Sequence, residues 1–372
     1  MSSTRRPPSR AARAPRAAAA LRPMAASGPA ADPRPVAGLR AVASLALGAL
    51  ALGAVPAASA ADDYFVYVSP DPIGVNAFLQ MGKSGTELAA EAAGAEVATY
   101  ESTTAAARRE NLEAAIDEGA TLVVLLGFEF NDAVAELAPT ATDVDFLIVD
   151  QCIESPPANV HCAVFREYES AHLMGVAAAM LTETKRVGMV GALDIPFLHR
   201  HSEGFAGGVR AVDADVEVDV RWVGGQNPFA DPVRAKEQAL ALHGAGADVI
   251  LAATAGGDFG VFEAAEEAGF DVMNVDVNFC DEAPGRIVDS MIKRVDEAIG
   301  QSVRRILAGE DAVFLSLGLA EGGMSAIALD EAGLGESGCA IADHPEVVEA
   351  VRAEAERIVS GELELEDPMF AR

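Results

Sequence analysis

The sequence is poor in aromatic, basic and cysteine residues. Of its 372 residues, one is Trp, four are Cys, and 27 are Lys or Arg against 57 Asp or Glu, a formal net charge of −30. So large an acidic excess repels nucleic-acid phosphates and anionic lipid, and nonspecific nucleic-acid binding is excluded. Hydrophobic residues make up 51%, so a sizeable core can form and global disorder is excluded. The length suggests two domains or one large α/β unit.

Motifs of the common enzyme classes are also missing. The sequence has no GxxxxGK[ST] phosphate loop, no GxGxxG after the first predicted strand, no GxSxG and no HExxH. The six His residues are scattered, and His199 and His201 are expected to be solvated or hydrogen-bonded rather than catalytic. We therefore predict a protein that is not an enzyme and that uses no cofactor or metal.

Residues 1–60 differ from the rest of the chain in composition. They hold eight Arg and one Asp, and residues 41–55 form an uncharged apolar run. That run is shorter than the roughly 20 residues that a membrane-spanning helix needs. Ala58-x-Ala60 offers the small residues that signal peptidase accepts, so cleavage after Ala60 is expected. Residues 1–60 are predicted to be a signal peptide with a long n-region, with a membrane anchor as the alternative, and the mature chain is expected to be soluble and periplasmic or extracytoplasmic.

Export brings the cysteines into oxidising conditions, in which disulfides form. Cys152 and Cys162 lie ten residues apart around a turn-rich stretch, so a disulfide between them is predicted, and Cys280 with Cys339 is a weaker second pair. A metal site at Cys152, His161 and Cys162 is the alternative. The adjacent His-Cys pair is poor spacing for tetrahedral ligation, and no CxxC pair occurs in the sequence to supply further ligands.

From residue 63 onward, short apolar runs alternate with helical segments. Strands are expected at 64–68, 96–100, 121–126, 145–150, 186–191, 217–223, 248–253, 272–277 and 313–317. Helices are expected at 76–93, 104–118, 132–137, 167–183, 205–212, 232–244, 261–268, 287–308 and 344–360. Apolar runs of this length between helices indicate parallel sheets covered on both faces. The pattern predicts an α/β protein with two doubly wound, Rossmann-like lobes, whose strand ends surround a shared ligand cleft.

An exported two-lobed chain without catalytic motifs is best interpreted as a solute-binding protein whose lobes close around a ligand. Several phrases of the sequence strengthen this interpretation in combination. They include GFEFNDAV at 127–134, FLIVD at 146–150, GMVGA at 188–192, GFAGGV at 204–209, VDVN at 275–278 and SMIKRVD at 290–296. With these phrases the chain resembles, from about 63 to 320, the basic membrane protein family of ABC transporter substrate-binding proteins, which includes purine nucleoside receptors.

The resemblance implies a fold and a set of lobes. The family has the type I periplasmic binding protein fold, in which the chain crosses between the lobes three times at the hinge. The N-terminal lobe is then expected at 61–164 plus about 289–311, and the C-terminal lobe at 165–288 plus about 312–372.

The resemblance also implies ligand-binding residues. In the nucleoside-binding members two aromatic rings sandwich the base, carboxylates bind base and ribose, and a Lys assists. Carried over by motif, Phe78 and Phe229 are the stacking pair, Asp150 and Asp276 the carboxylates, Lys293 the cation, and Gly257 allows close backbone approach. Asn76, Glu129 and Asn278 are further candidates at the cleft. Each residue has a structural alternative; for example, Lys293, predicted within a helix, could instead pair with Asp289 or Asp296 on the surface.

The resulting hypothesis is an exported receptor that captures a small ligand, with a nucleoside favoured, and acts as a monomer. Its partners would be the permease and ATPase subunits of an ABC importer. The alternatives are a binding protein for a sugar or another heterocycle, a nucleosidase-type hydrolase, and a sensory receptor that uses the same cleft.

Overall fold

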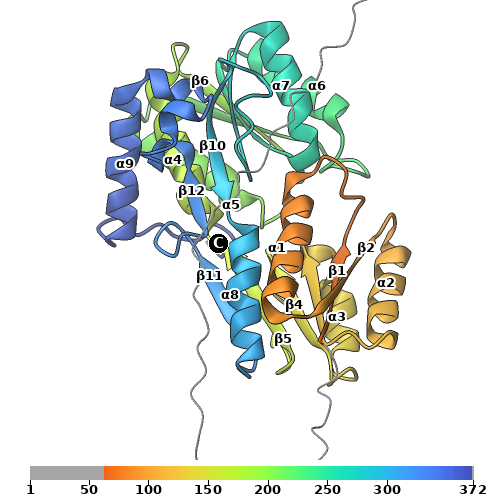
Figure 1. The fold of residues 1–372 in the computed structure, drawn as a ribbon. Coiled ribbons are helices and arrows are strands. Elements are labelled where there is room, and N and C mark those ends of the chain that lie inside the picture. Colours follow the sequence, from red (N-terminus) through yellow and green to blue (C-terminus); the bar gives the residue numbers. More distant parts are fainter. Residues whose placement is uncertain (1–62, 371–372) are drawn as a thin grey trace, which may run out of the picture. The chain divides into compact units, whose positions relative to one another are not determined.

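The computed structural model describes residues 63–370, so the predicted signal peptide at 1–60 lies outside the described residues. Two six-stranded sheets form the centres of two lobes (Figure 1). Within the described range, no helix is long and apolar enough to cross a membrane.

The first lobe is built on a parallel sheet with the strand order β11-β5-β4-β3-β1-β2. Its strands are β1 (Tyr64–Ser69), β2 (Glu96–Glu101), β3 (Leu122–Leu126), β4 (Asp145–Val149), β5 (Val160–Phe165) and β11 (Phe314–Leu317). Its helices are α1 (Ala77–Ala93), α2 (Ala105–Asp117), α3 (Asn131–Leu137) and α8 (Val295–Leu307). Successive residues of β1 point to opposite faces: Phe65 and Tyr67 join one buried cluster, and Val66 and Val68 join another. Both faces are therefore covered, as the continuous apolar runs predict.

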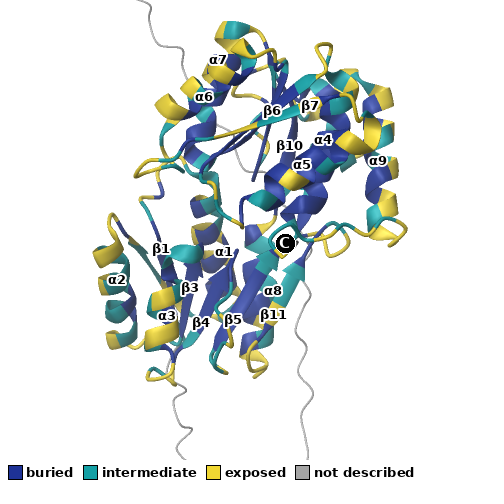
Figure 2. Cartoon of the chain, turned by 180° about the vertical axis from the view of Figure 1, so that it is seen from behind, coloured by how far each residue is buried: buried dark blue, intermediate teal, exposed yellow. Residues whose placement is uncertain are grey.

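The second lobe repeats this order as β12-β10-β9-β8-β6-β7. Its strands are β6 (Arg186–Gly191), β7 (Glu217–Trp222), β8 (Val249–Ala253), β9 (Asp271–Asn274), β10 (Ile287–Lys293) and β12 (Met324–Ala326), and only β12 is antiparallel to its neighbour. Its helices are α4 (Glu167–Leu181), α5 (His199–Val212), α6 (Pro232–Gly244), α7 (Asp258–Ala268) and α9 (Pro345–Val359). In Figure 2 the strands of both sheets are mostly buried, and the exposed residues lie on the outer helix faces and loops.

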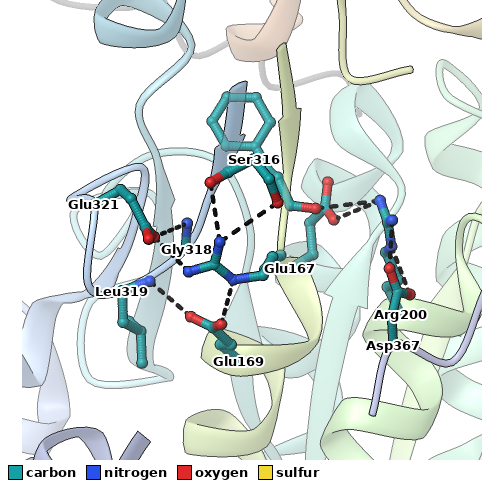
Figure 3. Close-up of polar contacts among 10 residues, drawn as sticks. Glu167, Glu169, Arg200, Ser316, Gly318, Leu319, Glu321 and Asp367 are labelled. Atoms are coloured by element: carbon teal, nitrogen blue, oxygen red, sulfur yellow. Dashed lines mark hydrogen bonds and ion pairs between the residues drawn. The ribbon is translucent and has the colours of Figure 1, made fainter. Parts of the chain in front are cut away.

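The chain passes between the two sheets three times. The passages run from β5 into α4, from β10 into α8, and from β11 to β12. Arg166 joins the first passage to the third, because its guanidinium donates to the backbone oxygen of Ser316 at 2.9 Å and to the carboxylates of Glu169 and Glu321 (Figure 3).

The prediction of one long helix over 287–308 is wrong. Residues Ile287–Lys293 form β10, a buried strand of the second sheet, and α8 begins only at Val295. The run IVDSMIK has apolar residues at spacings that suit a helix, but it lies between β9 and β12, where both faces are covered. β5, which the sequence analysis did not anticipate, fills the corresponding place in the first sheet.

The positions of β10 and β11 differ from the expected limits of the lobes. β10 belongs to the second sheet and β11 to the first, so the chain returns to the first lobe over 295–317 instead of about 289–311. β11 pairs in parallel with β5, from Phe314 beside Cys162 to Leu317 beside Phe165.

Candidate functional site

A cavity lies where the carboxyl ends of the strands of both lobes meet. The first lobe contributes the residues after β1, β3 and β4, together with the start of α1. The second lobe contributes the turn before α5, the loop before α6, and the residues after β8 and β9. In the first sheet β1 lies beside β3, and β2 and β4 extend the sheet in opposite directions from this pair; β6, β8, β7 and β9 are arranged in the same way in the second sheet. In open α/β sheets, ligands bind in the crevice at the point where the strand order changes direction in this manner.

Two aspartates occupy equivalent places in the two lobes. Asp150 follows β4 and Asp276 follows β9, the fourth strand of each sheet, and both line the cavity. Both have left-handed backbone, with φ of 81° and 77°, which is uncommon for residues other than Gly. Burial raises the pKa of Asp276 to about 6, although the charge of Lys293 opposes this. The carboxylate is therefore mostly ionised at neutral pH and can accept hydrogen bonds.

Lys293 lies at the end of β10 and links the lobes. Its Nζ contacts Asp150 of the first lobe and lies 2.9 Å from Oε1 of Glu167, and its side chain is 4% exposed. Burial lowers the pKa of Lys293, but Asp150, Glu167 and Asp276 outweigh it and hold the pKa above its usual value. The alternative in which Lys293 pairs with Asp289 or Asp296 on the surface is wrong, since Asp296 pairs with Arg294 and Asp289 is buried against backbone amides.

Aromatic rings surround this ammonium group. The Nζ of Lys293 lies 5.2 Å from the ring centre of Phe78, 4.9 Å from that of Phe165 and 5.6 Å from that of Phe197. Contacts of this length stabilise a desolvated cation through the ring quadrupoles. Phe229 also lines the cavity, and it packs against a small cluster that contains Phe197.

Two further predicted residues line the cavity. Asn76 is the N-cap of α1, where its Oδ1 accepts from the backbone nitrogen of Leu79 at 3.3 Å, so its NH₂ is the remaining polar group. Glu129 follows β3, and burial raises its pKa to about 7. Arg108 lowers this pKa, while Asp71 and Asp150 raise it.

The structure does not place Gly257 and Asn278 at the cavity. A Cβ on Gly257 would lie 2.7 Å from Oγ1 of Thr254, so this glycine faces the interior of its own lobe. The side chain of Asn278 donates to the backbone oxygen of Ser337 at 2.9 Å and accepts from the backbone nitrogen of Cys280. These contacts turn it toward the 337–339 loop and away from the cavity.

Three residues at or near the cavity were missed by the sequence analysis. Phe197 and His201 line it from the start of α5, and the fully buried Glu167 begins α4. Burial lowers the pKa of His201 to about 3, and the charge of Lys293 acts in the same direction, so the imidazole is neutral. No periodicity marks these three positions as cavity residues, because each becomes one only through the tertiary arrangement of the chain.

Two disulfides join the four cysteines. Cys152 pairs with Cys162, with 5.4 Å between their Cα atoms, and Cys280 pairs with Cys339, with 4.9 Å between theirs. His161, the third member of the alternative metal cluster, accepts from the backbone nitrogen of Val313 and contacts Asp145. Over residues 63–370, no group of His, Cys, Asp and Glu is arranged to hold a metal ion.

Two lobes with repeated sheet order, three passages between them and a cavity at their facing strand ends define a two-lobed ligand-binding protein. The chain belongs to a family of this kind: the model of the family described as "ABC transporter substrate-binding protein PnrA-like" matches residues 65–334. This confirms the predicted family, which is one of binding proteins and not of enzymes.

Curated relatives match part of the chain. The ABC transporter nucleoside-binding protein BmpA of Lactococcus lactis is 33% identical over 167 residues, which cover 45% of this chain and 46% of that protein. Basic membrane protein A of Borreliella burgdorferi is 28% identical, with 51% of this chain and 56% of that protein covered. The chain thus spans about half the length of these relatives.

Solved structures confirm the fold. A solute-binding protein of an ABC transporter system from Aeropyrum pernix superposes with a TM-score of 0.70 at 24% identity, covering 82% of this chain and 94% of that one. The glucose-galactose binding protein GanP from Geobacillus stearothermophilus superposes with a TM-score of 0.56 at 16% identity, covering 71% of this chain and 97% of that one. The predicted type I periplasmic binding protein fold is therefore confirmed.

Proposed function

We propose that the chain is the extracytoplasmic receptor of an ABC importer and that it captures a nucleoside between its lobes. One observation carries the proposal: a single cavity is lined from both lobes by aromatic rings and by buried carboxylates. The nucleoside-binding relative from Lactococcus lactis supports the same ligand class. The two disulfides suit the oxidising compartment in which such a receptor works.

The rings suit the base of a nucleoside. Phe78 comes from the first lobe and Phe229 from the second, and both are only partly buried at the cavity. A planar heterocycle gains contact area and favourable stacking from such faces, whereas a sugar ring gains less. These two rings are the proposed stacking pair.

The polar groups of the cavity suit an uncharged ligand that carries hydrogen-bond donors. Asp150 and Asp276 are acceptors that select amino, imino and hydroxyl hydrogens, and a ligand lacking those hydrogens would leave a buried acceptor unpaired. Lys293 is the one cation among the residues that line the described cavity, against four carboxylates: Asp71, Glu129, Asp150 and Asp276. This excess of negative charge disfavours phosphate groups, so the proposed ligand is the free nucleoside rather than a nucleotide.

The proposed partners follow from the family. The receptor would act as a monomer, close on its ligand through the three passages between the lobes, and deliver it to a separate permease with its ATPase. In this proposal the receptor itself makes and breaks no covalent bond of its ligand.

A thermal-shift screen of residues 61–372, followed by calorimetric titration, tests the proposal. The protein is first unfolded and refolded to remove carried-over ligand, and the panel holds purine and pyrimidine nucleosides, free bases and sugars. A ligand at about 100 times its Kd adds about 2.7 kcal/mol of stability, which raises Tm by several degrees. We expect the rise with nucleosides. A rise with sugars alone would replace the nucleoside by the sugar alternative, and chromatographic release of free base would indicate the hydrolase.

Variants then test the site. Asp276→Ala and Phe229→Ala are each expected to weaken nucleoside binding by at least about tenfold, since each removes a direct contact near the centre of the site. Phe314→Ala is the matched control, because Phe314 is 55% exposed on β11 and is absent from the cavity lining. Unchanged binding by Asp276→Ala would contradict the assignment of the cavity.

A further inference from the structure

A line of paired charges runs from the C-terminal segment to the cavity. Asp367 accepts two hydrogen bonds from the guanidinium of Arg200, at 2.9 Å from Nε and 2.6 Å from Nη2 (Figure 3). Nη1 of Arg200 lies 3.4 Å from Oε2 of Glu167. The other oxygen of Glu167 lies 2.9 Å from Nζ of Lys293, which also contacts Asp150. Five alternating charges thus connect the end of the chain with the ligand cavity.

These groups have little access to water. The side chains of Glu167, Lys293, Arg200 and Asp150 are between 0% and 7% exposed, and that of Asp367 is 20% exposed. The stability of a charge this deeply buried depends on its ion-pair partners, because water cannot reach it to take the place of a partner that is removed. Arg200 also donates to the backbone oxygen of Phe165, so it is held beside the first passage between the lobes.

Asp367 is itself fixed in place. Its Oδ1 accepts from the backbone nitrogen of Met369 at 3.0 Å, and the preceding segment is tied to α9 by a bond from the nitrogen of Leu363 to the oxygen of Arg357 at 2.9 Å. The match to the family model spans residues 65–334, and this segment follows that range.

The alternation of charges along this line allows Asp367 to affect Lys293, which it does not contact. With Asp367 present, Arg200 has a bidentate partner, and Glu167 can direct its second oxygen to Lys293. Without the charge of Asp367, Glu167 becomes the remaining carboxylate in contact with Arg200 and is drawn toward it. Lys293 would then lose part of its support and would no longer be held in its present position at the cavity.

We propose that Asp367 is a positioning residue for ligand binding, which holds Lys293 at the cavity through Arg200 and Glu167. The C-terminal segment is then part of the binding apparatus of this chain. The effect on affinity rests on the proposed function, in which Lys293 is the cation that lines the ligand cavity, but the effect on Lys293 itself does not.

Asp367→Asn tests the proposal, because it removes the charge and keeps the shape. Glu364→Gln is the matched control on the same segment, since Glu364 is exposed. Two quantities are measured on folded full-length mature protein: the Kd for guanosine by calorimetry, and the rate at which acetic anhydride modifies Lys293, read by mass spectrometry. Tm is recorded for every variant.

We expect Asp367→Asn to weaken guanosine binding about 3- to 30-fold, the range found for residues that act through a network, and to speed the modification of Lys293. Glu364→Gln should change neither. Asp367→Glu keeps the charge and should restore most of the affinity, and it carries the test if Asp367→Asn does not fold.

A role confined to holding the C-terminal segment would lower Tm and leave both Kd and Lys293 modification unchanged, and this outcome overturns the proposal. If wild-type protein binds another nucleoside of the panel but not guanosine, that nucleoside replaces guanosine in the titration. If it binds no nucleoside, the proposed ligand fails, and the modification rate alone decides whether Asp367 positions Lys293.

Discussion

Asp150 and Asp276 are the clearest case of single residues that explain the site. Each follows a buried strand, and each adopts a left-handed backbone conformation that few residues other than Gly tolerate. Asp and Asn adopt it more readily than other side chains, which suits an acceptor that must leave the strand and turn into a cavity. Six described residues other than Gly have positive φ, and the two aspartates among them are the two that the family motif indicates.

Glu129 gives a prediction at this scale. Its folded pKa of about 7 lies above the usual pKa of a Glu, so the protonated form stabilises the fold. This contribution is complete below the usual pKa and is lost as pH rises through about 7. Glu129→Gln should thus unfold like wild type near pH 4.5 and be more stable by about 1–2 kcal/mol at pH 8, allowing for partial exposure.

Urea unfolding of both proteins across this pH range measures the difference. Glu91→Gln serves as the control, since Glu91 is an exposed carboxylate on α1. A constant difference between Glu129→Gln and wild type at all pH values would show that burial does not perturb Glu129.

The sequence predicts some residues of the cavity and misses others for physical reasons. Asp150 and Asp276 could be predicted because the ends of apolar strands can be recognised locally. Phe197, His201 and Glu167 could not, because they reach the cavity through contacts with segments distant in the sequence, such as those of Phe197 and Glu167 with Lys293. The placement of Asn278 was wrong because its side chain is committed to Ser337, a contact across 59 residues of sequence.

At the scale of elements, α4 and α5 pack unusually closely. The two helices meet through glycines: a Cβ on Gly208 would overlap the backbone oxygen of His172, and one on Gly175 would overlap that of Phe205. The contact positions Glu167, at the start of α4, beside Arg200, near the start of α5. Small residues in this interface therefore also fix the charges behind the cavity.

Gly208→Ala should separate the two helices and destabilise the protein by about 1–3 kcal/mol, as overpacking generally does. Gly300→Ala on α8 is the matched control, because the nearest atom to its Cβ would be the end of the Arg304 side chain, at 3.3 Å. That substitution should be neutral or stabilising by up to about 1 kcal/mol, since Ala is the better helix former. Denaturant unfolding compares the two variants, and equal stabilities would argue against a tight α4–α5 contact.

The sequence predicts well those elements whose pattern of apolar residues is compatible with only one kind of secondary structure. Strands such as β3 and β8 are short apolar runs between turns, and the structure has them nearly as expected. β10 was mistaken for the first half of a helix because Ile287, Met291 and Val295 follow a helical spacing. Its true state depends on the sheet, which supplies neighbours on both sides.

On the scale of the whole molecule, each lobe carries one disulfide, and the two differ in the length of chain that they close. Cys152–Cys162 spans 10 residues and Cys280–Cys339 spans 59. In the chain-entropy description the shorter loop is worth about 3 kcal/mol and the longer about 4 kcal/mol. The double variant Cys280→Ser, Cys339→Ser should therefore lose more stability than Cys152→Ser, Cys162→Ser. Guanidinium unfolding measures both losses, and the opposite order would indicate that the unfolded chain is already compact near Cys280.

The shared strand order of the two sheets has a consequence for how this receptor can change. Each lobe presents its own half of the binding surface, with Asp150 on one side and Asp276 on the other. Under the proposed function, a substitution on the outer part of one half would alter the recognition of one side of the ligand and leave the contacts from the other lobe in place. A lineage built this way would then be able to exchange one ligand for a related one in single steps, with partial affinity retained at each intermediate.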